Sequence, residues 1–270
     1  MKAFVIDVAL CNGCYACQIA CKDEHVANDW SPIAKPQPDT GQFWLRLSEH
    51  IRGTVPKVKM HYVPHLCTHC AEASCMKACP VEGVIYQRED GIIIVDPEKC
   101  TGCRACEDIC SALFFNEDLN IAQKCTGCSH LIDSGEWDVP RCVDSCPTEA
   151  IKYGEEADLA ELIAKAKANG AECACGPRVY YLNIPKKFIG GTVYDPVEEE
   201  VVIGATCTLK DSAGKSSTAQ TDDFGDFWFE GLADDTYALT IAAKGFATKA
   251  FDEVSTEEKD VNLGDIPLDK

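Results

Sequence analysis

Four short runs of cysteine dominate the first 150 residues and restrict what this part of the chain can fold around. Runs one and three share the spacing C-x2-C-x2-C-x3-C, whereas runs two and four have a longer gap between the second and third cysteines and are followed by proline. The repeat is therefore tight, loose, tight, loose, with four thiols in each run. The runs are CNGCYACQIAC (11–21), CTHCAEASCMKAC (67–79), CTGCRACEDIC (100–110) and CTGCSHLIDSGEWDVPRCVDSC (125–146).

This spacing is typical of cubane [4Fe-4S] clusters. Each cluster needs four thiolates, and a tight loop with cysteines every third residue wraps only three of its corners. In two-cluster bacterial ferredoxins the last cysteine of each run ligates the other cluster. The proline after the last cysteine directs the chain away from the loop. Sixteen thiols therefore predict four clusters.

Zinc and disulfides are the alternatives for such a cysteine count. Structural zinc sites use two C-x2-C pairs and do not need the third, closely spaced cysteine of the tight runs. Disulfide frameworks belong to secreted domains, and the start MKAFVIDVALCNGC lacks the features of a secretory signal. We therefore expect iron–sulfur clusters.

Three of the 19 cysteines lie outside the runs. Cys173 and Cys175 are two positions apart, a spacing that no run uses, and are expected to be structural or free thiols. Cys207 lies in the apolar alternation GATCTL and is expected to be a small core residue.

Acidic residues outnumber basic ones in this chain, which restricts the classes of partner that it can bind. It has 270 residues, with 44 Asp and Glu against 25 Lys and Arg, a net charge of −19. This charge argues against binding to nucleic acid or to an anionic membrane surface. No run of about 18 apolar residues is present, so we expect no direct membrane insertion. No Ser/His/Asp or paired-carboxylate arrangement stands out, and no catalytic residue is assigned.

The segments around the cysteine runs predict short elements. Residues 84–86 and 92–95 flank an Asp-Gly turn and are expected to form a hairpin. Residues 3–9 and 150–153 are expected to be strands of an outer unit. Residues 158–170 predict a helix with Asp158 as its cap, Gly170 as its stop, and a buried stripe that consists of Leu159, Leu162 and Ile163.

Several side chains near the runs have two interpretations. Lys99 and Lys124 each precede a cluster cysteine, where a cation would raise the reduction potential, although a solvated surface lysine is equally consistent. His65 and His69 flank cysteines of run two and are within reach of a hydrogen bond there. Residues 28–66 lack cysteine and look suited to cover a partner. The aromatic residues of this segment are expected to pack in the core rather than to face a partner; they are Trp30, Phe43 and Trp44.

From residue 188 onward the chain alternates apolar and polar residues in short runs separated by turn signals such as DSAG and DDFG. This predicts an all-β sandwich or barrel of about seven strands. The pieces GGTVYD, TDDFGDFWFEGL and YALTIAAKGF resemble a transthyretin-like, carboxypeptidase-regulatory-like module without chemistry of its own. Asp222, Asp223 and Asp226 do not have the spacing of an EF-hand and are expected to be turn residues.

The four-run pattern, with HLCTHCAEASCMKACP, GIIIVDPEKCTGCRAC and NIAQKCTGCSH, resembles the iron–sulfur electron-transfer subunits of the dimethyl-sulfoxide-reductase family of molybdopterin enzymes over roughly residues 1–185. The resemblance implies an α+β fold of two pseudo-symmetric bacterial-ferredoxin-like units. Residues 1–65 with 111–187 would form an outer unit, 66–110 an inner unit, and 188–270 the transthyretin-like domain.

The resemblance also implies which cysteines are the iron ligands of each of four [4Fe-4S] clusters. The four sets are Cys11, Cys14, Cys17 and Cys146; Cys21, Cys125, Cys128 and Cys142; Cys67, Cys70, Cys75 and Cys110; and Cys79, Cys100, Cys103 and Cys106. It further implies a heterodimer with a large catalytic subunit that carries a molybdenum or tungsten bis-pterin centre.

The combination of four clusters with a C-terminal transthyretin-like domain is similar to the small subunits of anaerobic, cytoplasmic molybdenum transhydroxylases, which move a hydroxyl group between trihydroxybenzenes. This resemblance implies a cytoplasmic location. Two alternatives remain. One is the electron-transfer subunit of a respiratory sulfur-oxyanion or sulfoxide reductase. The other is a stand-alone polyferredoxin with a β docking domain.

Overall fold

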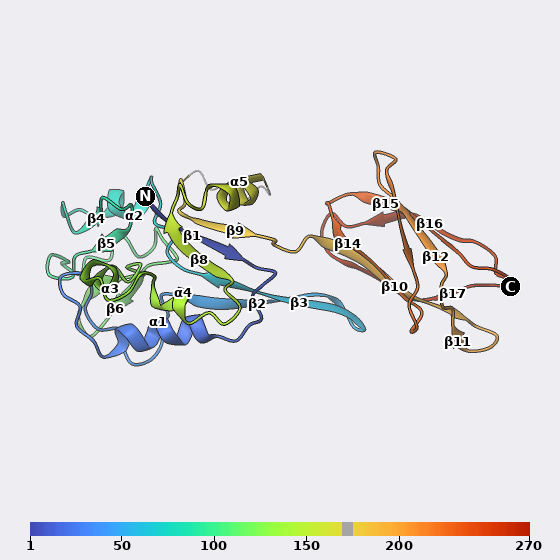
Figure 1. The fold of residues 1–270 in the computed structure, drawn as a ribbon, viewed down its shortest axis with the longest axis horizontal. Helices are drawn as coiled ribbons and strands as arrows, with labels where there is room; N and C mark the ends of the chain where they lie inside the picture. The colour runs from blue at the N-terminus through green and yellow to red at the C-terminus, as the bar shows by residue number, and fades with distance from the viewer. Residues whose placement is uncertain (169–174) are drawn as a thin grey trace. The chain divides into compact units, whose positions relative to one another are not determined.

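A computed structural model describes residues 1–168 and 175–270 of the chain. The described residues divide into two compact units (Figure 1). The first unit comprises Met1–Glu49 and His61–Ile184, and the second comprises His50–Met60 and Pro185–Lys270.

The first unit contains a three-stranded sheet with the strand order β8-β1-β9 (Figure 1). β1 (Lys2–Asp7) pairs antiparallel with β8 (Ile151–Glu155) and parallel with β9 (Val179–Leu182). Residues 3–6 of β1 are all buried because both faces of the strand are covered. The strands expected at 3–9 and 150–153 are present as β1 and β8, and the structure shows in addition that they pair.

Three two-stranded hairpins complete the strands of this part of the chain. They are β2 (Arg46–Thr54) with β3 (Lys57–His65), β4 (Ile85–Gln87) with β5 (Ile93–Val95), and β6 (Phe114–Asn116) with β7 (Ile121–Gln123). The β4–β5 hairpin confirms the pair predicted around the Asp-Gly turn. β5 is apolar throughout because its alternate side chains enter two different cores, with Ile94 in one and Ile93 and Val95 in the other.

The helices of this unit are short, and three of them carry the third cysteine of a run. These are α1 (Ala16–Val26) with Cys17, α2 (Ser74–Ala78) with Cys75, and α4 (Arg141–Asp144) with Cys142. α1 packs beside α4 (Figure 1). α3 (Ser129–Ser134) directly follows the second cysteine of run four.

α5 (Ala160–Ala168) lies within the helix expected at 158–170 and packs against β9. Its apolar stripe is confirmed, because Ile163 is buried while Leu159 and Leu162 pack partly buried against the same core. The expected stop at Gly170 lies outside the described residues.

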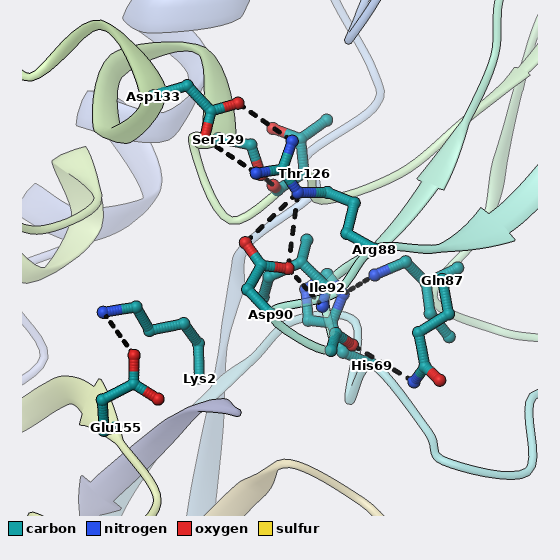
Figure 2. A network of polar contacts seen from close by, with 12 residues as sticks. Lys2, His69, Gln87, Arg88, Asp90, Ile92, Thr126, Ser129, Asp133 and Glu155 are labelled. Carbon is teal, nitrogen blue, oxygen red and sulfur yellow. Dashed lines mark hydrogen bonds and ion pairs between the residues drawn. The ribbon is translucent and has the colours of Figure 1, made fainter.

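A polar network fixes the turn of the β4–β5 hairpin (Figure 2). The Asp90 carboxylate accepts hydrogen bonds from the Ile92 N–H at 3.0 Å and from the Arg88 side chain. Arg88 in turn donates to both oxygens of Asp133, on α3, at 2.9 and 2.7 Å. A bidentate pair of this kind constrains geometry as well as charge, so it holds the hairpin turn against α3.

The second unit is an all-β domain of two four-stranded sheets, in agreement with the all-β prediction. Cys207 is fully buried in its core, as expected. Asp222 accepts hydrogen bonds from the Phe224 and Asp226 N–H groups, as a turn residue does. One sheet contains β10 (Lys187–Asp195), β11 (Glu200–Val201), β14 (Asp226–Leu232) and β17 (Val261–Pro267); the other contains β12 (Thr206–Lys210), β13 (Ser216–Gln220), β15 (Thr236–Ala242) and β16 (Lys249–Ser255).

The second unit also includes the tip of the β2–β3 hairpin, which a buried ion pair holds in place. The Arg52 guanidinium donates to both oxygens of Asp260, at 3.0 and 2.9 Å, and to the carbonyl oxygens of Pro185 and Lys186. Asp260 also accepts the Phe188 N–H at 2.8 Å and has a side chain only 6% exposed. Its carboxylate therefore depends on Arg52 for charge compensation.

We expect Arg52→Ala to lower the free energy of unfolding of the second unit by about 3–5 kcal/mol, because the substitution leaves a buried carboxylate unpaired. The matched control is Lys59→Ala, which removes an exposed ion pair with Glu230 and should cost at most about 1 kcal/mol. Urea denaturation followed by tryptophan fluorescence measures both. Equal losses for the two variants would contradict the assignment.

Candidate iron–sulfur sites

A left-handed residue precedes the second cysteine in every run. In three runs it is a glycine, at φ +74° for Gly13, +71° for Gly102 and +62° for Gly127. In run two the equivalent residue is His69, at φ +46°. Glycine adopts this conformation without steric cost, so the C-x-G-C sequences select the same tight turn in three of the four loops.

Run one meets the last cysteine of run four. The Cys17 thiol interacts electrostatically with those of Cys11, Cys14 and Cys146. Cys146 is also contacted by the Ala150 N–H, at 3.3 Å from its sulfur. The structure thus brings the first predicted set of four together.

The second predicted set is also brought together. The Cys142 thiol interacts with those of Cys21, Cys125 and Cys128, and all four residues are buried. Since Cys21 comes from run one and the others from run four, these two runs each contribute to both sets.

Runs two and three exchange cysteines in the same way. Cys75 interacts with Cys67 and Cys110, and the Thr68 hydroxyl lies 2.9 Å from the Cys70 sulfur. The fourth predicted set, Cys79, Cys100, Cys103 and Cys106, lines a single pocket together with Val84, Ile85, Val95 and Phe115.

Contacts between the sets define their order. Cys17 of the first set interacts with Cys142 of the second, and Cys125 of the second interacts with Cys67 of the third. The third and fourth sets share one apolar cluster, which contains Cys75 and Cys106. The order is therefore first, second, third, fourth. Among the cysteines that the structure describes, exposed ones occur only at the two ends of this order, at Cys14 in the first set and Cys103 in the fourth.

Burial and mutual repulsion disfavour bare thiolates in these sets. Burial raises the pKa of Cys17 and of Cys128 to about 12 and that of Cys106 to about 11. Burial together with neighbouring thiols raises the pKa of Cys21 and of Cys142 well above the usual value. Thiolates at these positions require compensating positive charge, which iron supplies.

Unpartnered polar atoms beside the cysteines fit a sulfur-rich group. His69 is fully buried, and its Nδ1 accepts the Ile93 N–H at 3.0 Å, which leaves the proton on Nε2. That Nε2 has no hydrogen-bond partner within the described residues, and neither has the buried Thr126 hydroxyl between Cys125 and Cys128. Figure 2 shows His69 and Thr126 in the same region. Cluster sulfides accept such hydrogen bonds, so these residues fit the [4Fe-4S] group.

The two lysines that precede cluster cysteines have different environments. Lys99 has a side chain 60% exposed and pairs with Asp96 at 2.7 Å, as a surface lysine does. Lys124 is 2% exposed, and its ammonium donates to the carbonyl oxygens of Ile93 and Cys125. Of the two, only Lys124 is therefore a cation inside the cysteine-rich core.

The remaining candidate residues have varied surroundings. Trp44 is buried in the core and Trp30 packs against it, as expected; Phe43 is half-buried. His65 lies 2.8 Å from the Ser48 hydroxyl. Cys175 is disulfide-bonded, and Cys173 lies outside the described residues.

Two histidines that were not predicted from the sequence lie close to cysteines of the second set. His25, on α1, is buried, and burial lowers its pKa to about 3. His130, on α3, contacts Glu24 at 3.0 Å and stacks on Trp30. The available signal was their position, four residues after Cys21 and two after Cys128.

Known protein families match both parts of the chain. A 4Fe-4S binding domain matches residues 9–24, a 4Fe-4S dicluster domain matches 58–156, and a carboxypeptidase regulatory-like domain matches 189–269. Within the described residues, no helix is long and apolar enough to cross a membrane.

Several characterised proteins are similar to this chain. The pyrogallol hydroxytransferase small subunit of Pelobacter acidigallici is 35% identical, over 98% of this chain and 98% of its own. One of the tetrathionate reductase subunits of Salmonella typhimurium is 32% identical, over 69% of this chain and 74% of its own. One of the chains of the anaerobic dimethyl sulfoxide reductase of Escherichia coli is 34% identical, over 56% of this chain and 72% of its own. The chain therefore belongs to the family of iron–sulfur electron-transfer subunits that includes these three proteins.

Proposed function

We propose that the chain holds four [4Fe-4S] clusters, one in each set of four cysteines. The observation that carries the proposal is that each set takes three cysteines from one run and one from another. This is the ligand arrangement of two-cluster ferredoxins, here repeated for runs one and four and for runs two and three. We propose accordingly that residues 1–65 with 111–187 hold two clusters and that residues 66–110 hold the other two.

Bound clusters supply one-electron transfer. The residues of this chain hold them in a fixed order, with every cysteine of the second set buried and those of the third set buried or half-buried. The exposed Cys14 and Cys103, at opposite ends of that order, mark the two places where electrons enter or leave. No catalytic residue is proposed in this chain.

We further propose that the chain forms a heterodimer with a large subunit that carries a molybdenum or tungsten bis-pterin centre, and that the complex transfers a hydroxyl group between trihydroxybenzenes, converting pyrogallol to phloroglucinol. The support is the similarity to the pyrogallol hydroxytransferase small subunit, which extends over 98% of the chain and so includes the C-terminal domain. Because this transfer is redox-neutral overall, the clusters would set the oxidation state of the partner's metal. We place the complex in the cytoplasm of an anaerobe.

The C-terminal domain is proposed to be a transthyretin-like module that braces the complex without chemistry of its own. The match to a carboxypeptidase regulatory-like domain at 189–269 supports this.

A second candidate function is electron transfer in a respiratory sulfur-oxyanion or sulfoxide reductase. The similarity to a component of tetrathionate reductase favours it, although that similarity covers 69% of the chain. A stand-alone polyferredoxin is the third possibility.

We expect the native complex, purified without oxygen, to contain about 16 iron atoms per copy of this chain, four for each cubane, and one molybdenum or tungsten. It should convert pyrogallol to phloroglucinol. Metal analysis and product chromatography measure these. Iron without a heavy metal would favour the polyferredoxin, and zinc in place of iron would contradict the cluster assignment.

We expect Thr126→Val to make the potential of the second-set cluster more negative by roughly 20–60 mV. A hydrogen bond contributes roughly 0.5–1.5 kcal/mol, and about 59 mV corresponds to a tenfold change in a one-electron equilibrium. Redox titration followed by electron paramagnetic resonance (EPR) measures the shift.

The matched control is Thr101→Val, the same substitution in the same CTGC sequence of run three, where the threonine is exposed. Thr101 lines the pocket of the fourth set but is exposed, so Thr101→Val should shift a potential less than Thr126→Val does. An equal shift in both variants, or none in either, would show that the Thr126 hydroxyl does not contact the cluster.

A further inference from the structure

The sequence KCTGC occurs twice, at 99–103 and at 124–128, and places the two lysines in very different surroundings. Lys99 is exposed and neutralised by Asp96. Lys124 is enclosed, and no carboxylate in the described part of the chain forms an ion pair with it. The same local sequence thus provides a buried uncompensated cation and an exposed compensated one.

Backbone groups hold the Lys124 ammonium between two loops. It donates to the carbonyl oxygen of Ile93, on β5, and to that of Cys125 at 2.9 Å. The N–H of the same Ile93 donates to His69, in the loop of run two. Lys124 therefore sits where the loops of runs two and four approach the same residue of β5.

The charge of Lys124 acts on cysteines of two different sets. It interacts electrostatically with Cys75, in the third set, and with Cys125, in the second, and its ammonium lies 2.9 Å from the carbonyl oxygen of Cys125. These two sets adjoin, since Cys125 also interacts with Cys67. In a dry interior such interactions are screened far less than at the surface.

We infer that Lys124 is a shared potential-setting residue, which makes the two central clusters easier to reduce than they would be without it. The inference rests on the proposed function. Each cluster that accepts one electron from a reductant becomes more negative by one charge, and a fixed cation favours that state. One cation at this position would thereby raise the potentials of two neighbouring clusters together.

A purely structural role for Lys124 makes a different prediction. If its hydrogen bonds only tied β5 to run four, removing them would loosen both loops without shifting two potentials in one direction. Two substitutions separate the roles: Lys124→Gln removes the charge and keeps an amide donor, whereas Lys124→Arg keeps the charge. Lys124→Met removes both.

The test is a dithionite titration of the whole anaerobic complex, followed by EPR, with iron content measured for each variant. In Lys124→Gln and Lys124→Met the reduction equilibrium of two clusters should weaken at least tenfold, about 59 mV, while the other two clusters keep their potentials. Lys124→Arg should stay near the wild type, and Lys99→Met, the matched control, should shift none.

The inference is overturned if Lys124→Gln retains the iron of four clusters and shifts no potential, or if all four potentials shift equally. Either result leaves the proposed function intact. Wild-type complex without four clusters would instead overturn the proposed function and the inference with it.

Discussion

The pairing of each cysteine run with the last cysteine of another run is the constraint on which the first unit depends. Cys146 reaches the thiols of run one, and Cys21 reaches those of run four. This exchange requires the two ends of the unit to be adjacent, which the antiparallel pairing of β1 with β8 provides. The β4–β5 hairpin, which joins runs two and three along the chain, brings those two runs together in the same way. Much of the ordinary core is thereby replaced by thiols that face one another.

The same arrangement explains the distribution of polar groups. Burial raises the pKa of these thiols, so their thiolates need positive charge or hydrogen-bond donors nearby. The structure places the Lys124 ammonium and the His69 imidazole N–H where the second and third sets adjoin. The sets at the two ends include the exposed cysteines instead. A fully buried second set, with exposed cysteines only in the first and fourth sets among the described cysteines, suits a protein that passes electrons through its interior.

Much of the fold and of the candidate cluster sites was predictable, because cysteine spacing and short apolar runs are local signals. The four runs, the Asp-Gly hairpin, the separate strands β1 and β8 and the all-β C-terminal domain each follow from a few neighbouring residues, whereas the pairing of β1 with β8 joins residues far apart in the sequence. The surroundings of Lys99 and Lys124 were not predictable, because KCTGC is identical in both places and burial is decided by distant packing. The attachment of residues 50–60 to the second unit depends on Arg52 and Asp260, which are 208 positions apart, and no pattern within the hairpin indicates it. His25 and His130 lie four residues after Cys21 and two residues after Cys128, but a single histidine at either distance does not form a recognised ligand pattern, so neither was predicted.

The exchange of cysteines between runs is decided by the cluster to which Cys146 belongs. EPR spectra of the reduced complex should be compared for Cys14→Ser, Cys142→Ser and Cys146→Ser. We expect Cys146→Ser to alter the same spectral component as Cys14→Ser, although the two residues lie in different runs, and Cys142→Ser to alter another. If Cys146→Ser and Cys142→Ser altered one component and Cys14→Ser a different one, each run would hold its own cluster, and the exchange of cysteines between runs would be wrong.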